Sequence, residues 1–225
     1  MDSRAVSGRI KANIWPWLRE RGFSRFSERS AWRYVAEAIH VVTFQSFNAY
    51  NAEVLGITTY SFSVRLGIHL TQIPPACGGT AFPRKGPPKP HEDECHLRAS
   101  MRRSLSQPQA CRSDIWYIDP SGKYLDPAME DVASQLGAVD TGWFKRYSDQ
   151  GEVLSLLLGP SLDDPEGAVW GFGNPDSPLR HYQIGYMARA LGHQELACEH
   201  LTCAAVHFRG NERLAADIID CGWKS

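Results

Sequence analysis

The sequence predicts an α+β fold with an N-terminal helix, an antiparallel sheet of four to five strands, helices after the sheet, and a C-terminal helical hairpin plus a capping helix. Three observations lead to this prediction. Apolar residues recur at helical spacing near the N-terminus, β-branched and aromatic runs follow up to residue 118, and helical periodicity returns from residue 126. Because strand-rich and helix-rich parts are separate along the chain, the pattern favours α+β over an alternating α/β fold.

The chain of 225 residues is long enough to bury a core without disulfide or metal staples. We expect an α+β domain over residues 1–158 and a helical extension over residues 159–225 that packs on it. A Pro-rich loop at residues 71–94 interrupts the domain with six prolines and three glycines. A loop of this length is typical of a functional or a disordered segment.

The first helix is predicted over residues 4–21, where apolar side chains form one stripe. Pro16 removes one N–H group from the backbone ladder and disfavours a helical conformation of the residue before it, so we expect a kink there. Gly22 can adopt a left-handed conformation and is expected to end the helix.

Five short segments after this helix have strand character. In residues 60–66, apolar side chains alternate strictly with serine and arginine, which predicts a strand with one buried and one solvent-exposed face. Residues 48–52 are polar and are predicted to form a loop. The predicted strands are residues 32–35, 39–45, 60–66, 95–98 and 115–118.

The helical part is predicted to begin at Asp126, which is expected to cap a helix whose first position is Pro127. A second, leucine-rich helix is expected to end at Gly159. Three more helices are predicted at about residues 179–191, 193–207 and 211–221.

The first two of these three helices, Leu179 to Phe208, resemble a single tetratricopeptide-like helical hairpin. Small residues such as Gly185 let two antiparallel helices approach closely, Gly192 permits the tight turn, and Leu201 fills the interface. The matching positions are Ile184, Gly185, Gly192, Ala197, Leu201 and Ala204. Because one such repeat cannot bury its own apolar face, the hairpin is expected to pack on the rest of the chain, with the last helix as a cap.

Several motifs over about residues 8–158 occur in a characteristic order. They are Leu18–Phe23, Val41–Gln45, Phe62–Gly67, Cys95–Arg98, Asp114–Tyr117 and Gly142–Phe144. In this order they resemble the bacterial family catalogued as domain of unknown function 4304. The resemblance implies a compact α+β domain and brings no catalytic residues with it.

The formal net charge of −1 conceals an asymmetry between the two halves of the sequence. Residues 1–112 carry a net charge of +8 and residues 113–225 a net charge of −9. The strongest acidic stretch, residues 113–170, has 11 acidic and 3 basic side chains. Such a distribution can orient a charged partner, although the two halves can also neutralise each other in the fold.

The leading prediction is a non-enzymatic protein-binding module, such as an immunity protein or a defence-operon adaptor that occludes its partner. The expected partner is another protein, for example a toxin or an operon product. Nucleic acid is not expected at this net charge, and a membrane is not expected because no stretch approaches about 18 apolar residues. The N-terminus lacks an apolar signal core, so a cytoplasmic location is expected. The candidate partner-binding residues are Trp143, Phe144, Tyr147, Asp163, Asp164, Glu166 and Trp170.

The alternative prediction is a metal-dependent nuclease or nucleotide-processing enzyme. In this hypothesis Asp114 and Asp119, which flank a predicted strand, would bind the metal. The candidate phosphate-binding residues are Arg98, Arg102, Arg103 and Arg112. The sequence contains no P-loop, no GxGxxG and no GxSxG motif, so an enzyme is the less favoured class.

Two groups of residues have the side chains that bind transition metals. The first group is Cys77, His91, Cys95, His96 and Cys111. Its spacing does not match a compact zinc finger, so no cofactor is expected and zinc remains the alternative. The second group, His200, Cys203 and His207, shares one helix face, and its simpler interpretation is the polar flank of the hairpin.

Overall fold

The computed structural model describes residues 3–76, 86–107, 112–159, 174, 176–208 and 210–220. The chain forms two compact units. Unit 1 comprises Met1–His69 and Pro90–Phe144, and unit 2 comprises Leu70–Lys89 and Lys145–Ser225. This grouping places residues 145–158 with the C-terminal helices.

Unit 1 begins with two short helices, α1 (Ser3–Arg9) and α2 (Trp15–Glu20), joined by a π-helical turn, Ile10–Ile14. The wider turn lies directly before the first turn of α2, which contains Pro16, so the helix changes its hydrogen bonding where the sequence predicts a kink. Gly22 has a φ of +84° after the end of α2, as expected for a residue that ends a helix.

Five antiparallel strands follow in the order β1-β2-β3-β4-β5, which confirms the predicted sheet. The register pairs Trp32 with Val41 between β2 and β3, and Gly67 with Arg98 between β4 and β5. The strands are β1 (Arg25–Phe26), β2 (Ser30–Val35), β3 (Ala38–Ser46), β4 (Phe62–Leu70) and β5 (Leu97–Ser100).

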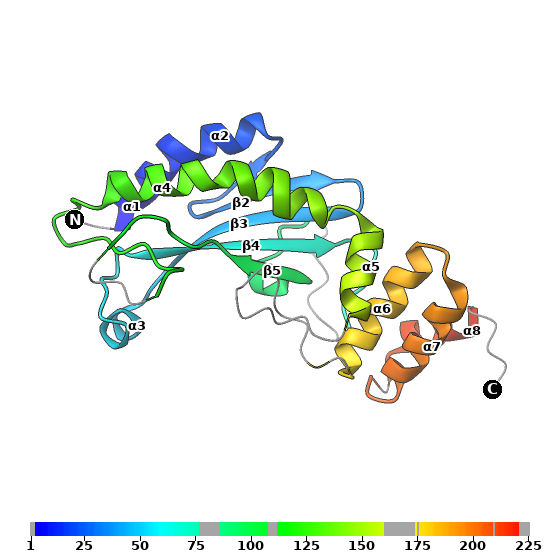
Figure 1. Cartoon of the computed structure of the whole chain (residues 1–225). Coiled ribbons are helices and arrows are strands. Elements are labelled where there is room, and N and C mark those ends of the chain that lie inside the picture. Colours follow the sequence, from blue (N-terminus) through cyan, green and yellow to red (C-terminus); the bar gives the residue numbers. More distant parts are fainter. Residues whose placement is uncertain are drawn as a thin grey trace. The chain divides into compact units, whose positions relative to one another are not determined.

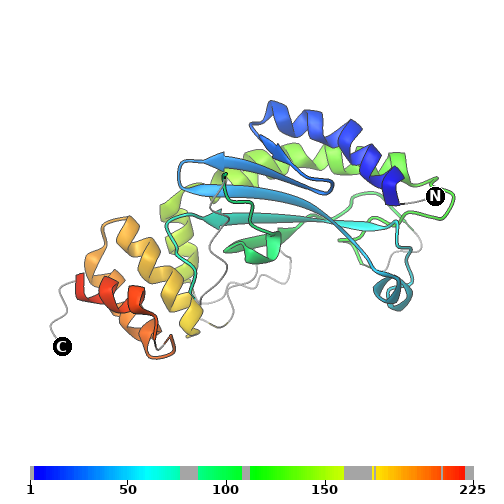
Figure 2. The same cartoon turned by 180° about the vertical axis from the view of Figure 1, so that it is seen from behind.

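Helix α4 (Leu125–Ala138) packs against α1 and the π-helical turn that follows it. Figures 1 and 2 show α1, α2 and α4 side by side over one face of the sheet. The core between these layers contains a chain of aromatic contacts, in which the ring of Phe44 lies 5.7 Å from Trp15 and 5.5 Å from Phe62. Phe62 in turn stacks on Trp116 at 5.7 Å.

Four local expectations for unit 1 are wrong. Residues 49–54 form a helix, α3 (Ala49–Val54), because the side chain of Asn48 accepts a hydrogen bond from the Asn51 N–H and caps it. The serine face of β4 is buried rather than solvent-exposed, with Ser63 fully inaccessible.

Residues 115–118 contribute only a single bridge to β4 at Trp116. Asp126 lies inside α4 and forms an ion pair with Arg9 instead of capping the helix.

Unit 2 is helical, and its last three helices confirm the predicted hairpin and capping helix. Tyr182 donates a hydrogen bond to the carbonyl of Pro75, and Asn211 donates one to the carbonyl of Ala76. The start of the Pro-rich loop is therefore held against the C-terminal helices. The helices are α5 (Gln150–Leu158), α6 (Pro178–Ala190), α7 (Gln194–Ala205) and α8 (Glu212–Asp220).

The contact between α6 and α7 depends on Gly185. A Cβ atom at this position would lie 2.6 Å from two side-chain carbons of Leu201, which is fully buried. Gly192 forms the turn between the helices with a φ of +81°, a conformation that favours glycine. Both glycines and Leu201 have the packing roles that the sequence predicts for them.

Candidate functional site

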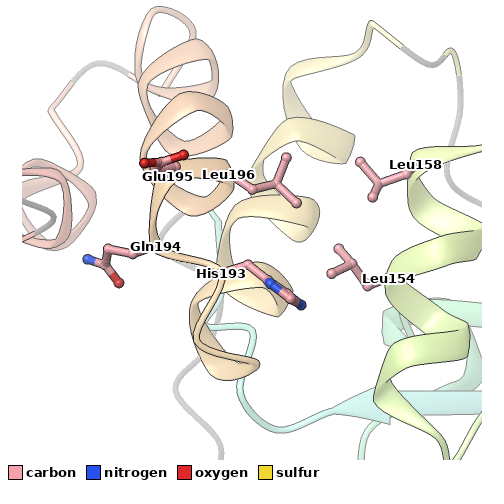
Figure 3. A pocket seen from close by; sticks show the side chains of 6 residues that line it. All are labelled: Leu154, Leu158, His193, Gln194, Glu195 and Leu196. Carbon is pink, nitrogen blue, oxygen red and sulfur yellow. The ribbon is translucent and has the colours of Figure 1, made fainter.

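A groove of about 510 Å³ lies between α5 and the start of α7 in unit 2. In Figure 3, two leucines of α5 point across the groove toward Leu196 and His193. The side chains of Gln194 and Glu195 point away from these leucines. The residues that line the groove are Leu154, Leu158, His193, Gln194, Glu195 and Leu196.

Helix α5 supplies the apolar wall of the groove. Asp149 begins the helix by accepting hydrogen bonds from the N–H groups of Gly151 and Glu152. The helix is so rich in leucine that its apolar surface extends beyond the side that is buried. Leu154 is 6% exposed, whereas Leu158, one turn later on the same flank, is 47% exposed.

The opposite wall is the first turn of α7. The turn at Gly192 reverses the chain so that α7 starts beside α5, and His193 precedes the helix without capping it through its side chain. Leu196 is partly buried and His193 is exposed. The groove therefore combines an apolar interior with an imidazole at one end.

Chemically, this arrangement is suited to binding rather than to covalent chemistry. Three leucine side chains favour an apolar group, and His193 can donate or accept a hydrogen bond beside it. The volume exceeds that of one aliphatic side chain and lies within the range of small-ligand sites.

Among the predicted partner-binding residues that the structure describes, the rings of Trp143 and Phe144 are in contact, with their centroids 5.1 Å apart. Phe144 and Tyr147 are 1% and 5% exposed, so neither is the surface anchor that the sequence suggested. The ring of Phe144 stacks on His40 at 4.7 Å, which explains its burial. Trp143 is partly exposed in unit 1. The remaining candidates, Asp163, Asp164, Glu166 and Trp170, lie outside the described residues.

His40 belongs to a buried polar cluster that the sequence did not reveal. Arg33 donates hydrogen bonds to the His40 Nδ1 atom at 2.9 and 3.1 Å and forms an ion pair with Asp140 at 2.7 Å. Burial and the neighbouring Arg33 charge lower the pKa of His40 to about 3. The imidazole is therefore neutral at pH 7 and serves as an acceptor that orients Arg33.

Two of the predicted nucleotide-processing residues, Arg112 and Asp114, are paired with each other. Arg112 donates to both carboxylate oxygens of Asp114, at 2.9 and 2.6 Å, and Arg65 lies 3.6 Å from the same carboxylate. Hydrogen bonding from Arg112 lowers the pKa of Asp114 against the effect of burial. Asp119 accepts hydrogen bonds from Ser121 and from the backbone N–H of Tyr124. Its carboxylate therefore stabilises the turn that begins at Asp119.

Among the other predicted phosphate-binding residues, Arg103 donates to the Leu105 carbonyl at 2.6 Å. Arg98 is partly buried on β5, and Arg102 is exposed just after it. Arg103 and Arg112 are therefore already engaged in hydrogen bonds within the chain.

Of the predicted zinc group, the structure describes His91, Cys95 and His96, and these three do not form a metal-ligand cluster. Cys77 and Cys111 lie outside the described residues. Cys95 is buried and its thiol donates to the His91 carbonyl, while the ring of His96 contacts His69 at 4.7 Å. Burial raises the pKa of the Cys95 thiol, which disfavours the thiolate that zinc binds. In the part of the chain that the structure describes, no three His, Cys, Asp or Glu side chains converge as metal ligands.

Comparison with known protein families, with curated proteins and with solved structures finds no match. Within the described residues, no helix has the length and apolar character needed to cross a membrane.

Sequence reasoning did not select the groove, but α5 contains a signal that could have found it. Leu154, Leu156, Leu157 and Leu158 cover most of the circumference of a helix, whereas a surface helix normally buries one stripe. Such a helix has more apolar surface than one buried side can accommodate. The sequence does not indicate that Leu196 faces the leucines of α5, because the proximity of α7 to α5 depends on the tertiary fold.

Proposed function

We propose that the chain is a protein-binding module that holds an apolar side chain of its partner in the groove between α5 and α7. The observation that supports this function is the convergence of three leucines from two helices on one open groove. Leu158 leaves nearly half of its surface exposed beside this groove. Apolar groups of this kind, surrounded by polar residues, are typical of the centres of protein interfaces.

The expected energetic gain is sufficient for a binding anchor. Full burial of one leucine-sized side chain contributes about 1.5–3 kcal/mol. Insertion of such a side chain from the partner would also cover the exposed part of Leu158. The remainder of the interface would come from surrounding polar contacts, which exclude water more than they add free energy.

The proposed partner is another protein, and the function class is an immunity protein or defence-operon adaptor that acts by occlusion. The acidic stretch of residues 113–170 is a feature of the sequence that favours a basic partner, because opposite charges accelerate association. Three of its carboxylates, Asp114, Asp126 and Asp140, form ion pairs with arginines of the chain and contribute less to this effect. The similarity of residues 8–158 to the family of unknown function remains a prediction and adds no activity to this proposal.

The test is affinity purification from the native host with three forms of the full chain. Leu158→Glu places a charge in the groove, and Ile219→Glu is the matched control because Ile219 is a 70% exposed apolar residue of α8. We expect one host protein to be retained by the wild type and by Ile219→Glu and lost with Leu158→Glu. The candidate is then purified, and its Kd for each form is measured by calorimetry.

We expect Leu158→Glu to weaken the reconstituted complex by about 1.5–3 kcal/mol, or roughly 10- to 150-fold in Kd. Unchanged circular dichroism and melting temperature would establish that the variant is folded. Equal binding of Leu158→Glu and the wild type to every retained protein would refute the groove as the binding site.

A further inference from the structure

Two histidines on neighbouring helices of unit 2 face each other. The Nδ1 atoms of His181 on α6 and His200 on α7 lie 2.8 Å apart, and the ring centroids are 4.8 Å apart. Both side chains are partly buried. At this distance the two nitrogens either share one proton or are placed to share one positively charged ligand.

The distance also indicates the coordination geometry. With metal–nitrogen bonds of about 2.0–2.1 Å, two ligands at a right angle lie about 2.9 Å apart, and two at a tetrahedral angle lie about 3.3 Å apart. The observed 2.8 Å is closer to the right angle. Tetragonal coordination with nitrogen and oxygen ligands is characteristic of Cu²⁺ and Ni²⁺.

We propose that His181 and His200 form a two-histidine site for a divalent transition-metal ion of the Cu²⁺ and Ni²⁺ class, bound through both Nδ1 atoms. In the described part of the chain, no third His, Cys, Asp or Glu side chain completes a metal-ligand group. In the proposed complex, water would complete the coordination of the bound ion. His200 also belongs to the group His200, Cys203 and His207, which the sequence interprets more simply as the polar flank of the hairpin. The proposed pair differs from that group in spanning two helices, since side chains from adjacent helices can converge on one ion.

The test uses the tag-free full-length chain and Ni²⁺ as the probe, titrated by isothermal calorimetry at pH 7.5. We expect one equivalent of Ni²⁺ to bind to the wild type. His181→Ala and His200→Ala should each weaken binding by more than about tenfold, since even outer-shell losses cost about 10–100-fold in metal affinity. His207→Ala is the matched control, because His207 is exposed near the end of α7 and lies outside the pair.

A second readout identifies the ligands directly. With one equivalent of Cu²⁺, the electron paramagnetic resonance spectrum should show hyperfine coupling to two imidazole nitrogens, and to only one in either alanine variant. The proposal is overturned if Ni²⁺ binding is not saturable at one equivalent. It is also overturned if both alanine variants bind as the wild type does, since the contact is then a hydrogen bond only.

Discussion

The substitution Gly185→Ala tests whether close contact between α6 and α7 determines the structure of unit 2. A Cβ atom at residue 185 would lie 2.6 Å from the Cγ and Cδ2 atoms of Leu201 and 3.1 Å from its backbone nitrogen. Carbon atoms in van der Waals contact lie at about 3.5–4.0 Å, so Leu201 would have to move by nearly 1 Å. Leu201 is fully buried and its backbone is part of α7, so the helices themselves must separate.

Two effects of opposite sign determine the magnitude. Replacing glycine by alanine inside a helix stabilises it by about 1 kcal/mol. Overpacking a buried contact costs about 1–3 kcal/mol, and the backbone contact places Gly185→Ala at the upper end of that range. We therefore expect the free energy of unfolding to fall by about 1–2 kcal/mol.

The control is Gly137→Ala in α4, where nothing lies within 4 Å of the added Cβ atom. Only the helix-propensity gain operates there, and stability should rise by about 0.5–1 kcal/mol. Urea denaturation followed by circular dichroism measures both changes. The packing argument is refuted if Gly185→Ala stabilises the protein as much as Gly137→Ala does.

Two further predictions concern unit 1. Gly67→Ala would place a Cβ atom 2.5 Å from the Cys95 Sγ atom and should cost about 1–3 kcal/mol. Adding Cys95→Ala should restore part of this loss in urea denaturation, and strictly additive effects would argue against the contact. For His40, whose folded pKa is about 3, the unfolded chain takes up a proton below pH 6.5 that the folded chain does not. The free energy of unfolding therefore decreases as the pH falls below 6.5, by about 2 kcal/mol at pH 5. His40→Gln should remove this contribution from the dependence of the unfolding free energy on pH.

The sheet and most helices could be predicted from the sequence because their periodicity is a local property. The β-branched run before residue 46 and the helical stripes after residue 178 match β3, α6 and α7. Two errors, at α3 and at Asp126, concern local helix starts. The other errors occur where long-range contacts determine burial and strand pairing. Ser61 looks solvent-exposed in the alternating pattern, yet it is buried, because its hydroxyl accepts the Ile118 N–H.

The candidate sites depend even more on the tertiary structure. Phe144 is an aromatic residue of the type found at interface anchors, but the structure buries its ring against His40 and Phe23. The groove needs α5 beside α7, and the histidine pair needs α6 beside α7. The proximity of α5 and α7 has no signature in residue spacing. The spacing does predict the α6–α7 hairpin, but it does not show which side chains of the two helices face each other.

The histidine pair and the hairpin packing have a common origin in Gly185. His181 lies one helical turn before Gly185, and His200 directly precedes Leu201, the residue that Gly185 contacts. The close approach of the two helices at Gly185 therefore contributes to the 2.8 Å distance between the two Nδ1 atoms. We therefore expect Gly185→Ala to weaken Ni²⁺ binding although it changes neither ligand, because it separates the helices that carry the two histidines. Gly137→Ala leaves Ni²⁺ binding unchanged, so loss of binding in both variants would show that the two features are not connected in this way.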